Sequence, residues 1–328
     1  MFNNSISANT QRFKFLKKNT LVILAKIIIA IGLLVYLIYS VEYNQIVYAL
    51  NQANIAIIGI VFLLGILNVY LQYFKWKITC EEVLEVKDNL KVFRSLFYGF
   101  SAGIITPLRV GEYFGRGIEF KDKSLIQVTV ATLIDKFFPL MMVASLGSVS
   151  SLFFIYHYYG VSIYVVLSLF ILIFTSFYLI FFLVSNKRFW NSILFSKLKT
   201  SHVFNSFQNK LAIFQNLDKN YFYKMLGISF LFYSCYLVQY ALLVIAFSNH
   251  DSFVDYLWAA NLIMFVKTII PPISLGELGI REGASVFFIS KMGEVASVGF
   301  NSSIFLFIIN LLIPALIGVG MFLRKNDK

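Results

Sequence analysis

Long apolar runs constrain the fold of this 328-residue chain more than any other feature. A helix needs about 20 consecutive apolar residues to cross the hydrocarbon core of a bilayer. Six runs reach that length: 21–40, 54–74, 125–156, 161–184, 225–247 and 295–323. Two further apolar stretches, 92–106 and 253–270, are shorter or interrupted. The sequence therefore predicts an all-α, polytopic membrane helix bundle.

The composition excludes a soluble protein of average make-up. Hydrophobic residues form 59% of the chain and charged residues 13%, which is well below the usual share of charge. The net charge of +12 could suggest a nucleic-acid partner, but Lys and Arg lie between the apolar runs rather than on a soluble basic module. We therefore interpret them as topology signals and contacts to anionic lipid, and expect no nucleic-acid partner.

The distribution of Lys and Arg predicts the orientation, because short cytoplasmic loops carry the excess of positive charge. The basic segments are 1–20, 75–94, 107–123, 185–224 and 324–328, whereas 41–53, 157–160 and 248–254 contain no Lys or Arg. Six full spans and two re-entrant or broken helices satisfy this alternation, with two more ordinary spans as the alternative. We expect a cytoplasmic segment at 1–20, one integral membrane domain at 21–323 and a cytoplasmic tail at 324–328.

The basic loop 185–224 holds seven Lys or Arg residues and one acid, Asp218, interleaved with aromatic residues. This pattern favours an amphipathic helix on the anionic cytoplasmic leaflet. A docking site for a partner protein is the alternative. Small residues such as Gly59 and Gly65 would allow close helix packing, including that of a homodimer.

A ten-residue phrase occurs twice, each time at the end of one of the shorter apolar stretches. Residues Pro107–Arg116 read PLRVGEYFGR and residues Pro272–Arg281 read PISLGELGIR, so Pro, Gly, Glu and Arg recur at the same relative positions, 165 residues apart. Pro lacks the N–H that a helix interior needs and Gly weakens a helix, so both copies should interrupt one. The expected backbone breaks are Pro107, Gly111, Pro271, Pro272, Gly276 and Gly279. Three full spans between the copies would make them antiparallel, as in an inverted repeat with a site near the midplane.

Ionisable residues at these breaks form the candidate site, because charges inside a membrane are costly and usually functional. Arg offers a planar fork of donors that matches phosphate oxygens, and carboxylates could balance that charge or bind a proton in a coupled cycle. Asp135 is expected to meet Arg109 or Arg281, and Lys136 to snorkel or hold a headgroup. The predicted substrate-binding residues are Arg109, Glu112, Arg116, Asp135, Lys136, Glu277, Arg281 and Glu282.

Structural roles are the alternative for several of these residues. Ser274 and Glu277 form an S-x-x-E capping box, which would explain Glu277 simply as part of a helix start. Arg109 stands where Ser274 stands in the other copy, so no capping box explains Glu112. The Arg residues could instead pair with Glu to hold a repeat interface together, and Asp135 could serve its own helix.

The chain lacks the motifs of nucleotide-driven and hydrolytic chemistry. It contains no G-x-x-x-x-G-K-[ST], no H-E-x-x-H and no G-x-S-x-G. Its two cysteines and three histidines are scattered, so they form neither a disulfide framework nor a metal set. We expect no catalytic residue, no metal and no cofactor. Movement of a substrate would then be downhill, ion-coupled or driven by a partner.

The sequence resembles the transmembrane region of lysylphosphatidylglycerol synthases and their stand-alone, flippase-like relatives. The resemblance rests on TPLRVGEYFGR at 106–116, the Asp135-Lys136 pair and PPISLGELGIRE at 271–282. It implies a multi-pass protein of the cytoplasmic (inner) membrane that moves a phospholipid or polyprenyl-linked lipid between leaflets. Because the chain stops at Lys328, the aminoacyltransferase domain of the two-domain relatives is not expected.

Residue by residue, the resemblance implies a site that matches most of the charged residues already singled out. Those residues are Arg109, Glu112, Arg116, Asp135, Arg281 and Glu282. Glu277 departs from the family pattern, since many relatives carry a second Gly there, and its charge could alter headgroup preference.

The leading hypothesis is a translocase for an anionic, aminoacylated or polyprenyl-linked lipid, whose headgroup is held by Arg109, Arg116 and Arg281. One alternative is an intramembrane lipid-modifying transferase with Glu112 or Asp135 as general base. Another is a non-transporting accessory subunit of an envelope glycan or lipid pathway, recruited through the loop 185–224.

Overall fold

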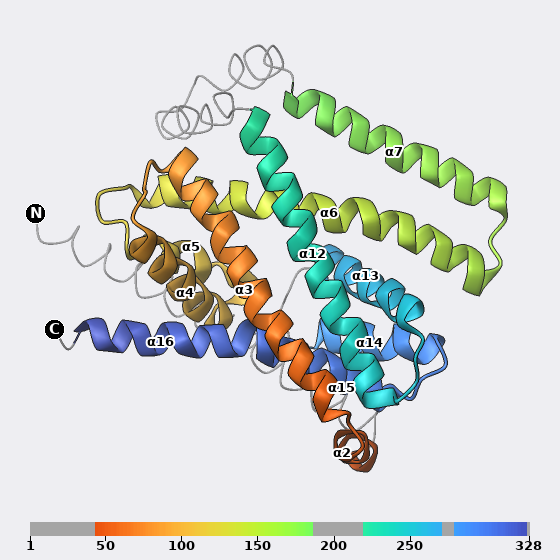
Figure 1. Cartoon of the computed structure of the whole chain (residues 1–328). Coiled ribbons are helices and arrows are strands. Elements are labelled where there is room, and N and C mark those ends of the chain that lie inside the picture. Colours follow the sequence, from red (N-terminus) through yellow and green to blue (C-terminus); the bar gives the residue numbers. More distant parts are fainter. Residues whose placement is uncertain (1–42, 186–218, 271–278, 327–328) are drawn as a thin grey trace, which may run out of the picture.

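The computed structural model describes residues 43–185, 219–270 and 279–326, and every regular element in these ranges is a helix (Figure 1). In chain order they are α2 (Tyr43–Asn51), α3 (Ile55–Val83), α4 (Asn89–Ile105), η1 (Pro107–Arg109), α5 (Gly111–Gly117), α6 (Leu125–Tyr159), α7 (Ile163–Ser185), α12 (Lys219–Ser248), α13 (Phe253–Ile269), α14 (Ile280–Lys291), α15 (Ala296–Phe307), η4 (Ile308–Leu312) and α16 (Ile313–Asn326). The predicted all-α architecture is confirmed for the part of the chain that the structure describes.

Four continuous helical segments are long and apolar enough to cross a membrane: Ile55–Val83, Leu125–Tyr159, Asn220–Ser248 and Ala296–Arg324. They coincide with four of the predicted spans. The predicted span 161–184 is α7, whereas the span 21–40 and most of the loop 185–224 lie outside the described residues. Helix α12 begins at Lys219, within the last residues of that predicted loop.

Polar residues fix where two of these helices begin. The side chain of Asn54 accepts hydrogen bonds from the backbone N–H groups of Ala56 and Ile57, at 3.1 and 3.3 Å. Ser124 and Gln127 form a reciprocal capping box at the start of α6, with bonds of 2.9 and 3.3 Å. Such caps satisfy N–H groups that a helix leaves without partners at its first turn.

Helices α3 and α12 pack against each other in opposite directions. Side chains on each reach backbone oxygens on the other: Asn68 donates to Phe232, and Gln239 donates to Val61 at 3.2 Å. The backbone N–H of Asn54 also donates to the oxygen of Ala246 at 2.9 Å. Partner numbers fall along α12 as they rise along α3, so the pair is antiparallel.

Helix positions in the two halves of the chain follow the same spacing as the repeated phrase. Shifted by 165 residues, α3 falls on 220–248 and α4 on 254–270, each within one residue of the bounds of α12 and α13. Shifted likewise, α6 falls on 290–324, which the run from α15 through α16 largely covers. The repetition therefore extends from ten residues to a set of helices.

The first copy of the phrase lies at the turn of a tight helical hairpin. Helix α4 ends at Ile105, η1 follows, and α5 runs back along α4. This approach requires glycine, since a Cβ on Gly111 would lie 2.2 Å from the backbone oxygen of Ala102, and one on Gly115 would lie 2.3 Å from that of Tyr98. Of the predicted breaks, Pro107 lies between the end of α4 and the start of α5, and Gly111 is the first residue of α5.

A second hairpin is made by α13 and α14. The two helices pack together, and the hydroxyl of Tyr256 near the start of α13 donates to Glu294, just beyond the end of α14, at 2.5 Å. Gly279 precedes α14 with a φ of +95°, a backbone conformation that favours glycine. The other predicted breaks of this copy, Pro271, Pro272 and Gly276, lie outside the described residues.

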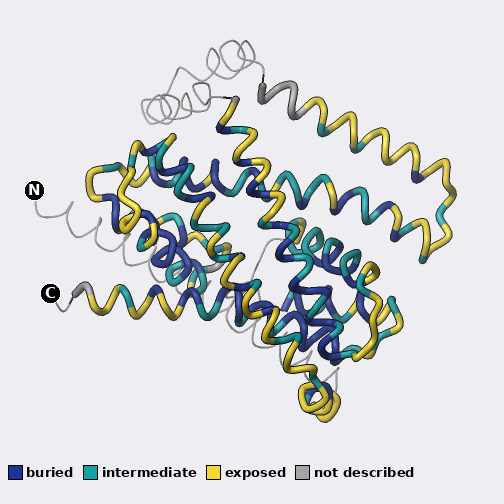
Figure 2. The backbone as a smooth tube through the Cα atoms, viewed as in Figure 1, coloured by how far each residue is buried: buried dark blue, intermediate teal, exposed yellow. Residues whose placement is uncertain are grey.

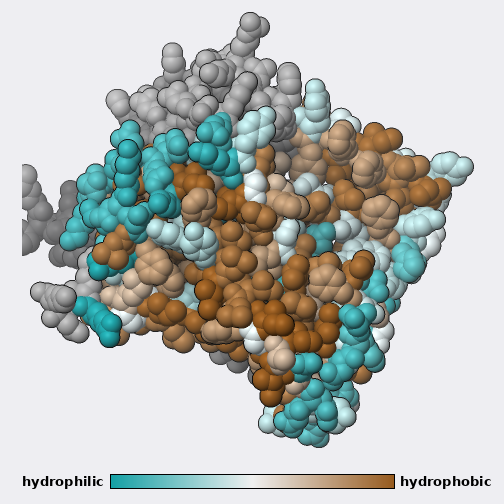
Figure 3. All heavy atoms as spheres, viewed as in Figure 1, coloured by the Kyte–Doolittle hydropathy of each residue, from teal (hydrophilic) through white to brown (hydrophobic). Residues whose placement is uncertain are grey.

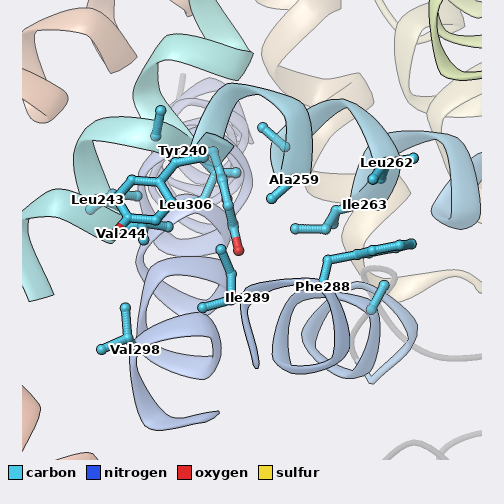
Figure 4. Close-up of a cluster of buried hydrophobic side chains, with 14 of the residues drawn as sticks. Tyr240, Leu243, Val244, Ala259, Leu262, Ile263, Phe288, Ile289, Val298 and Leu306 are labelled. Atoms are coloured by element: carbon cyan, nitrogen blue, oxygen red, sulfur yellow. The ribbon is translucent and has the colours of Figure 1, made fainter. Parts of the chain in front are cut away.

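Each hairpin packs into its own hydrophobic core. The larger core gathers side chains from α12 to α15, including Tyr240, Ile263, Phe288 and Leu306 (Figure 4). The other joins α3 and α4 around Trp76 and the start of α6. Many residues of both cores are buried, whereas most residues of α7 are exposed (Figure 2). On the face that Figure 3 shows, hydrophobic residues form a broad band between hydrophilic ends over the α3–α4 connection and over α2.

Candidate functional site

Charged residues of the first repeat copy and of α6 meet around one carboxylate, that of Glu112. Its Oε1 accepts a hydrogen bond from Nη2 of Arg116 at 2.8 Å. Its Oε2 accepts one from Nζ of Lys136 at 2.6 Å and lies 3.1 Å from Nη2 of Arg109. Glu112 is almost completely buried, so these three cations compensate a charge that would be very costly alone.

Arg116 joins this carboxylate to a second one. Its Nη1 donates to Oδ2 of Asp135 at 2.9 Å, and its guanidinium carbon lies 4.2 Å from the centre of the Trp76 ring. Its backbone oxygen accepts a bond from the hydroxyl of Ser95 at 2.8 Å, and the indole of Trp76 donates to the same hydroxyl. Arg116 is therefore fixed by ion pairs, a cation–π contact and a hydrogen bond of its backbone.

Lys75 completes the cluster and was missed by the sequence analysis. Its Nζ lies 2.8 Å from Oδ1 of Asp135 and also donates to the backbone oxygen of Asp135 at 2.6 Å. The prediction that Asp135 meets Arg109 or Arg281 is wrong, because Arg116 and Lys75 occupy both of its oxygens. The prediction of a basic loop at 75–94 hid Lys75, since α3 continues to Val83 and carries it inside the protein.

Exposure divides these six residues, which we call the first cluster, into a buried part and an accessible end. The side chains of Lys75, Glu112, Arg116 and Asp135 are at most 5% exposed. Those of Arg109 and Lys136 are 18% and 34% exposed. The described cluster therefore has four cations for two carboxylates, and its two accessible members are both cations.

The described part of the second copy forms a separate cluster on α14 and α15. Arg281 contacts Oε1 of Glu282 at 2.5 Å and donates through Nε to the hydroxyl of Ser303 at 2.9 Å. The other oxygen of Glu282 accepts from the backbone N–H of Gly279 at 2.6 Å. Arg281 and Glu282 are both fully buried, so among the described residues each ion of this pair compensates the charge of the other.

The two clusters differ in position as well as charge. Helix α5 packs on α4 and α6, whereas α14 packs on α13 and α15, and the two lie on opposite sides of the molecule in Figure 1. Arg281 is therefore not a member of the first cluster. Glu277 falls outside the described residues, so its predicted role stays a prediction.

Each repeat copy ends in an Arg that the following long helical segment holds. Arg116 is bound by Asp135 on α6, and Arg281 by Ser303 on α15. The acceptor for Arg116 is the charged carboxylate of Asp135, whereas the acceptor for Arg281 is the neutral hydroxyl of Ser303. The repeated Arg thus joins its hairpin to the next helix in both halves, and of the two described clusters only the first has more cations than carboxylates.

Comparison with known protein families gives one result that covers most of the chain. The family model described as the lysylphosphatidylglycerol synthase TM region matches residues 23–318. A search of curated proteins finds no match.

Proposed function

Because the chain belongs to the lysylphosphatidylglycerol synthase TM region family, we propose that it is a translocase that moves a lipid with a phosphate-containing headgroup between the leaflets of the cytoplasmic membrane. The observation that carries the proposal is the first cluster, with its excess of cations. Arg109 and Lys136 are its accessible members, and their donors suit phosphate oxygens. In this proposal they receive the headgroup, while Arg116 and Lys75 fix the carboxylates behind them.

We infer that the two halves form an inverted repeat, an arrangement that would favour transport over simple binding. Corresponding helices α3 and α12, related by the 165-residue shift, run antiparallel, and each repeat copy adjoins a hairpin that turns back on itself. Many transporters are built from repeats of opposite topology, with broken helices at the substrate site and two alternating accessible states. We therefore infer that the two hairpins, α4–α5 and α13–α14, are equivalent re-entrant elements entered from opposite leaflets.

An apolar groove beside the first hairpin offers a surface for lipid tails. It has a volume of about 790 Å³ and lies between α3, α4 and the last helical segment, lined by Phe62, Phe93, Ile309 and Pro314 among others. Its lining is almost entirely apolar. Acyl or polyprenyl chains could follow this groove in contact with the surrounding hydrocarbon, which would spare them exposure to water.

A transferase mechanism receives less support from the same geometry. The general base would be Glu112 or Asp135, and each carboxylate is bound by two or more cations. Cations at that distance stabilise the ionised carboxylate and weaken it as a proton acceptor. We therefore propose that the chain is not an enzyme, and that movement is downhill, ion-coupled or driven by a partner.

Lipid transfer by the purified chain tests the proposal. Proteoliposomes would contain fluorescent phosphatidylglycerol, fluorescent polyprenyl phosphate or a fluorescent neutral diacylglycerol, and a membrane-impermeant quencher would report probe in the outer leaflet. We expect protein-dependent transfer of at least one phosphate-bearing probe and none of the neutral lipid. Equal transfer of all three, or a product of changed mass, would reject the proposal.

A further inference from the structure

The two carboxylate oxygens of Glu112 have different partners: one binds a buried cation and the other binds two partly exposed cations. Oε1 faces Arg116, which is buried and also bound to Asp135. Oε2 is shared by Arg109 and Lys136, the two accessible cations of the first cluster. A phosphate that reaches this end therefore competes with Oε2 for the same two donors.

Displacement would leave Glu112 as a buried carboxylate with one remaining cation. That cation is Arg116, which Asp135 already shares. On its side toward α4, Glu112 lies next to Gly99 and Gly103. Glycine has no side chain, so these two residues supply neither a charge nor a side-chain donor. The new phosphate would also lie close to Glu112 and repel it. Loss of cations, burial and a neighbouring anion all favour the protonated carboxyl over the ionised one.

We propose that Glu112 takes up one proton from water when a phosphate headgroup displaces it from Arg109 and Lys136, so that headgroup binding and proton binding are linked. This inference rests on the headgroup site proposed above. The step breaks two ion pairs and forms one O–H bond on Glu112. For a singly charged phosphodiester the charge of the cluster is unchanged, because the phosphate replaces the carboxylate charge that the proton removes.

Asp135 is a poor candidate for the same role. Its oxygens are held by Lys75 from α3 and Arg116 from α5, and all three side chains are at most 5% exposed. No accessible cation of the described cluster binds it, so an arriving phosphate has no partner to remove. Glu112 is the carboxylate at the boundary between the accessible end and the buried part.

The dependence of binding on pH tests the linkage directly. Purified protein in nanodiscs of neutral lipid would be titrated with short-chain phosphatidylglycerol, and separately with dimethyl phosphate, a soluble phosphodiester that keeps a single charge, between about pH 6 and 8. If one proton binds with each phosphate group, affinity falls by up to about tenfold for each unit of pH increase. The lipid and the free ion distinguish a membrane substrate from a soluble one, because only the preferred source binds tightly.

Two variants separate Glu112 from the lysine beside it. In Glu112→Gln the pH dependence should disappear, since the amide cannot take up a proton. In Lys136→Arg it should remain, because an arginine stays charged throughout this range. A pH dependence that survives in Glu112→Gln but is lost in Lys136→Arg would assign the titration to Lys136 and overturn the inference.

A proton count on the wild-type protein keeps the test independent of how the variants fold. In weak buffer with a pH-sensitive dye, binding of phosphatidylglycerol should remove protons from solution, approaching one for each lipid bound. Binding without proton uptake would overturn the inference while leaving the translocase proposal standing. Lipid binding with proton uptake but without leaflet transfer would support the linkage and overturn the translocase proposal. Absence of binding by either phosphate source would overturn the linkage outright.

Discussion

Arg116 and Asp135 lie 2.9 Å apart between Nη1 and Oδ2, which joins the end of the repeated phrase to the first third of α6. The residues are separated by 19 positions, and neither is accessible. Their pairing explains why charge can be placed inside an apolar bundle: each ion has a partner on a different helix. Arg109 and Lys136, which pair with Glu112, are the more exposed members of the same cluster.

We predict that Lys75 stabilises the fold through Asp135. Lys75→Met should lower the free energy of unfolding by about 3 to 5 kcal/mol, because it leaves a buried carboxylate with one cation fewer. The double variant Lys75→Met with Asp135→Asn should lose less than the two single changes combined. Denaturation of the purified protein in detergent would measure this.

Lys77→Met is the matched control for Lys75, since it lies on the same helix but its side chain is 29% exposed and its ion pair with Glu81 is 3.8 Å long. It should change stability by less than about 1 kcal/mol. Equal losses at the two lysines would contradict the structural role of the buried pair.

The α4–α5 hairpin should depend on Gly115. Gly115→Ala places a methyl group against the backbone oxygen of Tyr98, and we expect a loss of about 1 to 3 kcal/mol. Gly59→Ala meets no atom within 4 Å and should be neutral or stabilising, because alanine favours a helix. Thermal unfolding of both variants would decide; a harmless Gly115→Ala would show that the hairpin is looser than described.

Arg281 should be required for folding rather than for headgroup contact. Arg281→Ala leaves Glu282 buried without its cation, which should cost about 3 to 5 kcal/mol. Ser303→Ala removes one hydrogen bond and should cost about 1 to 3 kcal/mol. Monodispersity and melting temperature are the readouts. A stable Arg281→Ala protein with selectively weakened lipid binding would instead place Arg281 in the ligand site.

The antiparallel contact of α3 and α12 can be tested by cross-linking. The thiol of Cys235 lies 3.5 Å from the backbone oxygen of Leu64, so Leu64→Cys in a Cys80→Ser background should form a cross-link with Cys235 through a short bifunctional reagent. Leu71→Cys, about two turns further along α3, packs near Met225 and Ile228 and should not. Reversal of these two results would contradict the observed register.

Much of the fold could be predicted from the sequence because the apolar runs are long and their caps are local. Four spans match the observed helices, and the repeated phrase identified the turn of the first hairpin. Positive charge was the misleading signal. Lys75 lies in a segment predicted to be a basic loop, yet it belongs to α3, because a long aliphatic stem and the buried counterion Asp135 allow a lysine inside the bundle.

The pairing within the site could not be predicted in the same way. Helical geometry indicated that Asp135 and Lys136 need different partners, but only the packing of α3, α5 and α6 selects Arg116 and Lys75 for one and Glu112 for the other. The first cluster depends on contacts between residues up to 60 positions apart. The spacing of residues along the sequence does not show which residues so far apart come into contact.

The rate of leaflet transfer in proteoliposomes tests the central claim most directly, with phosphatidylglycerol as the probe and three proteins compared. The account predicts that the double variant Arg109→Gln with Lys136→Gln loses about tenfold or more of the initial rate, as expected when charged hydrogen bonds to a phosphate are removed. Lys77→Gln, a control of similar exposure on α3, should transfer at the wild-type rate. Full transfer by a correctly folded double variant would contradict the account.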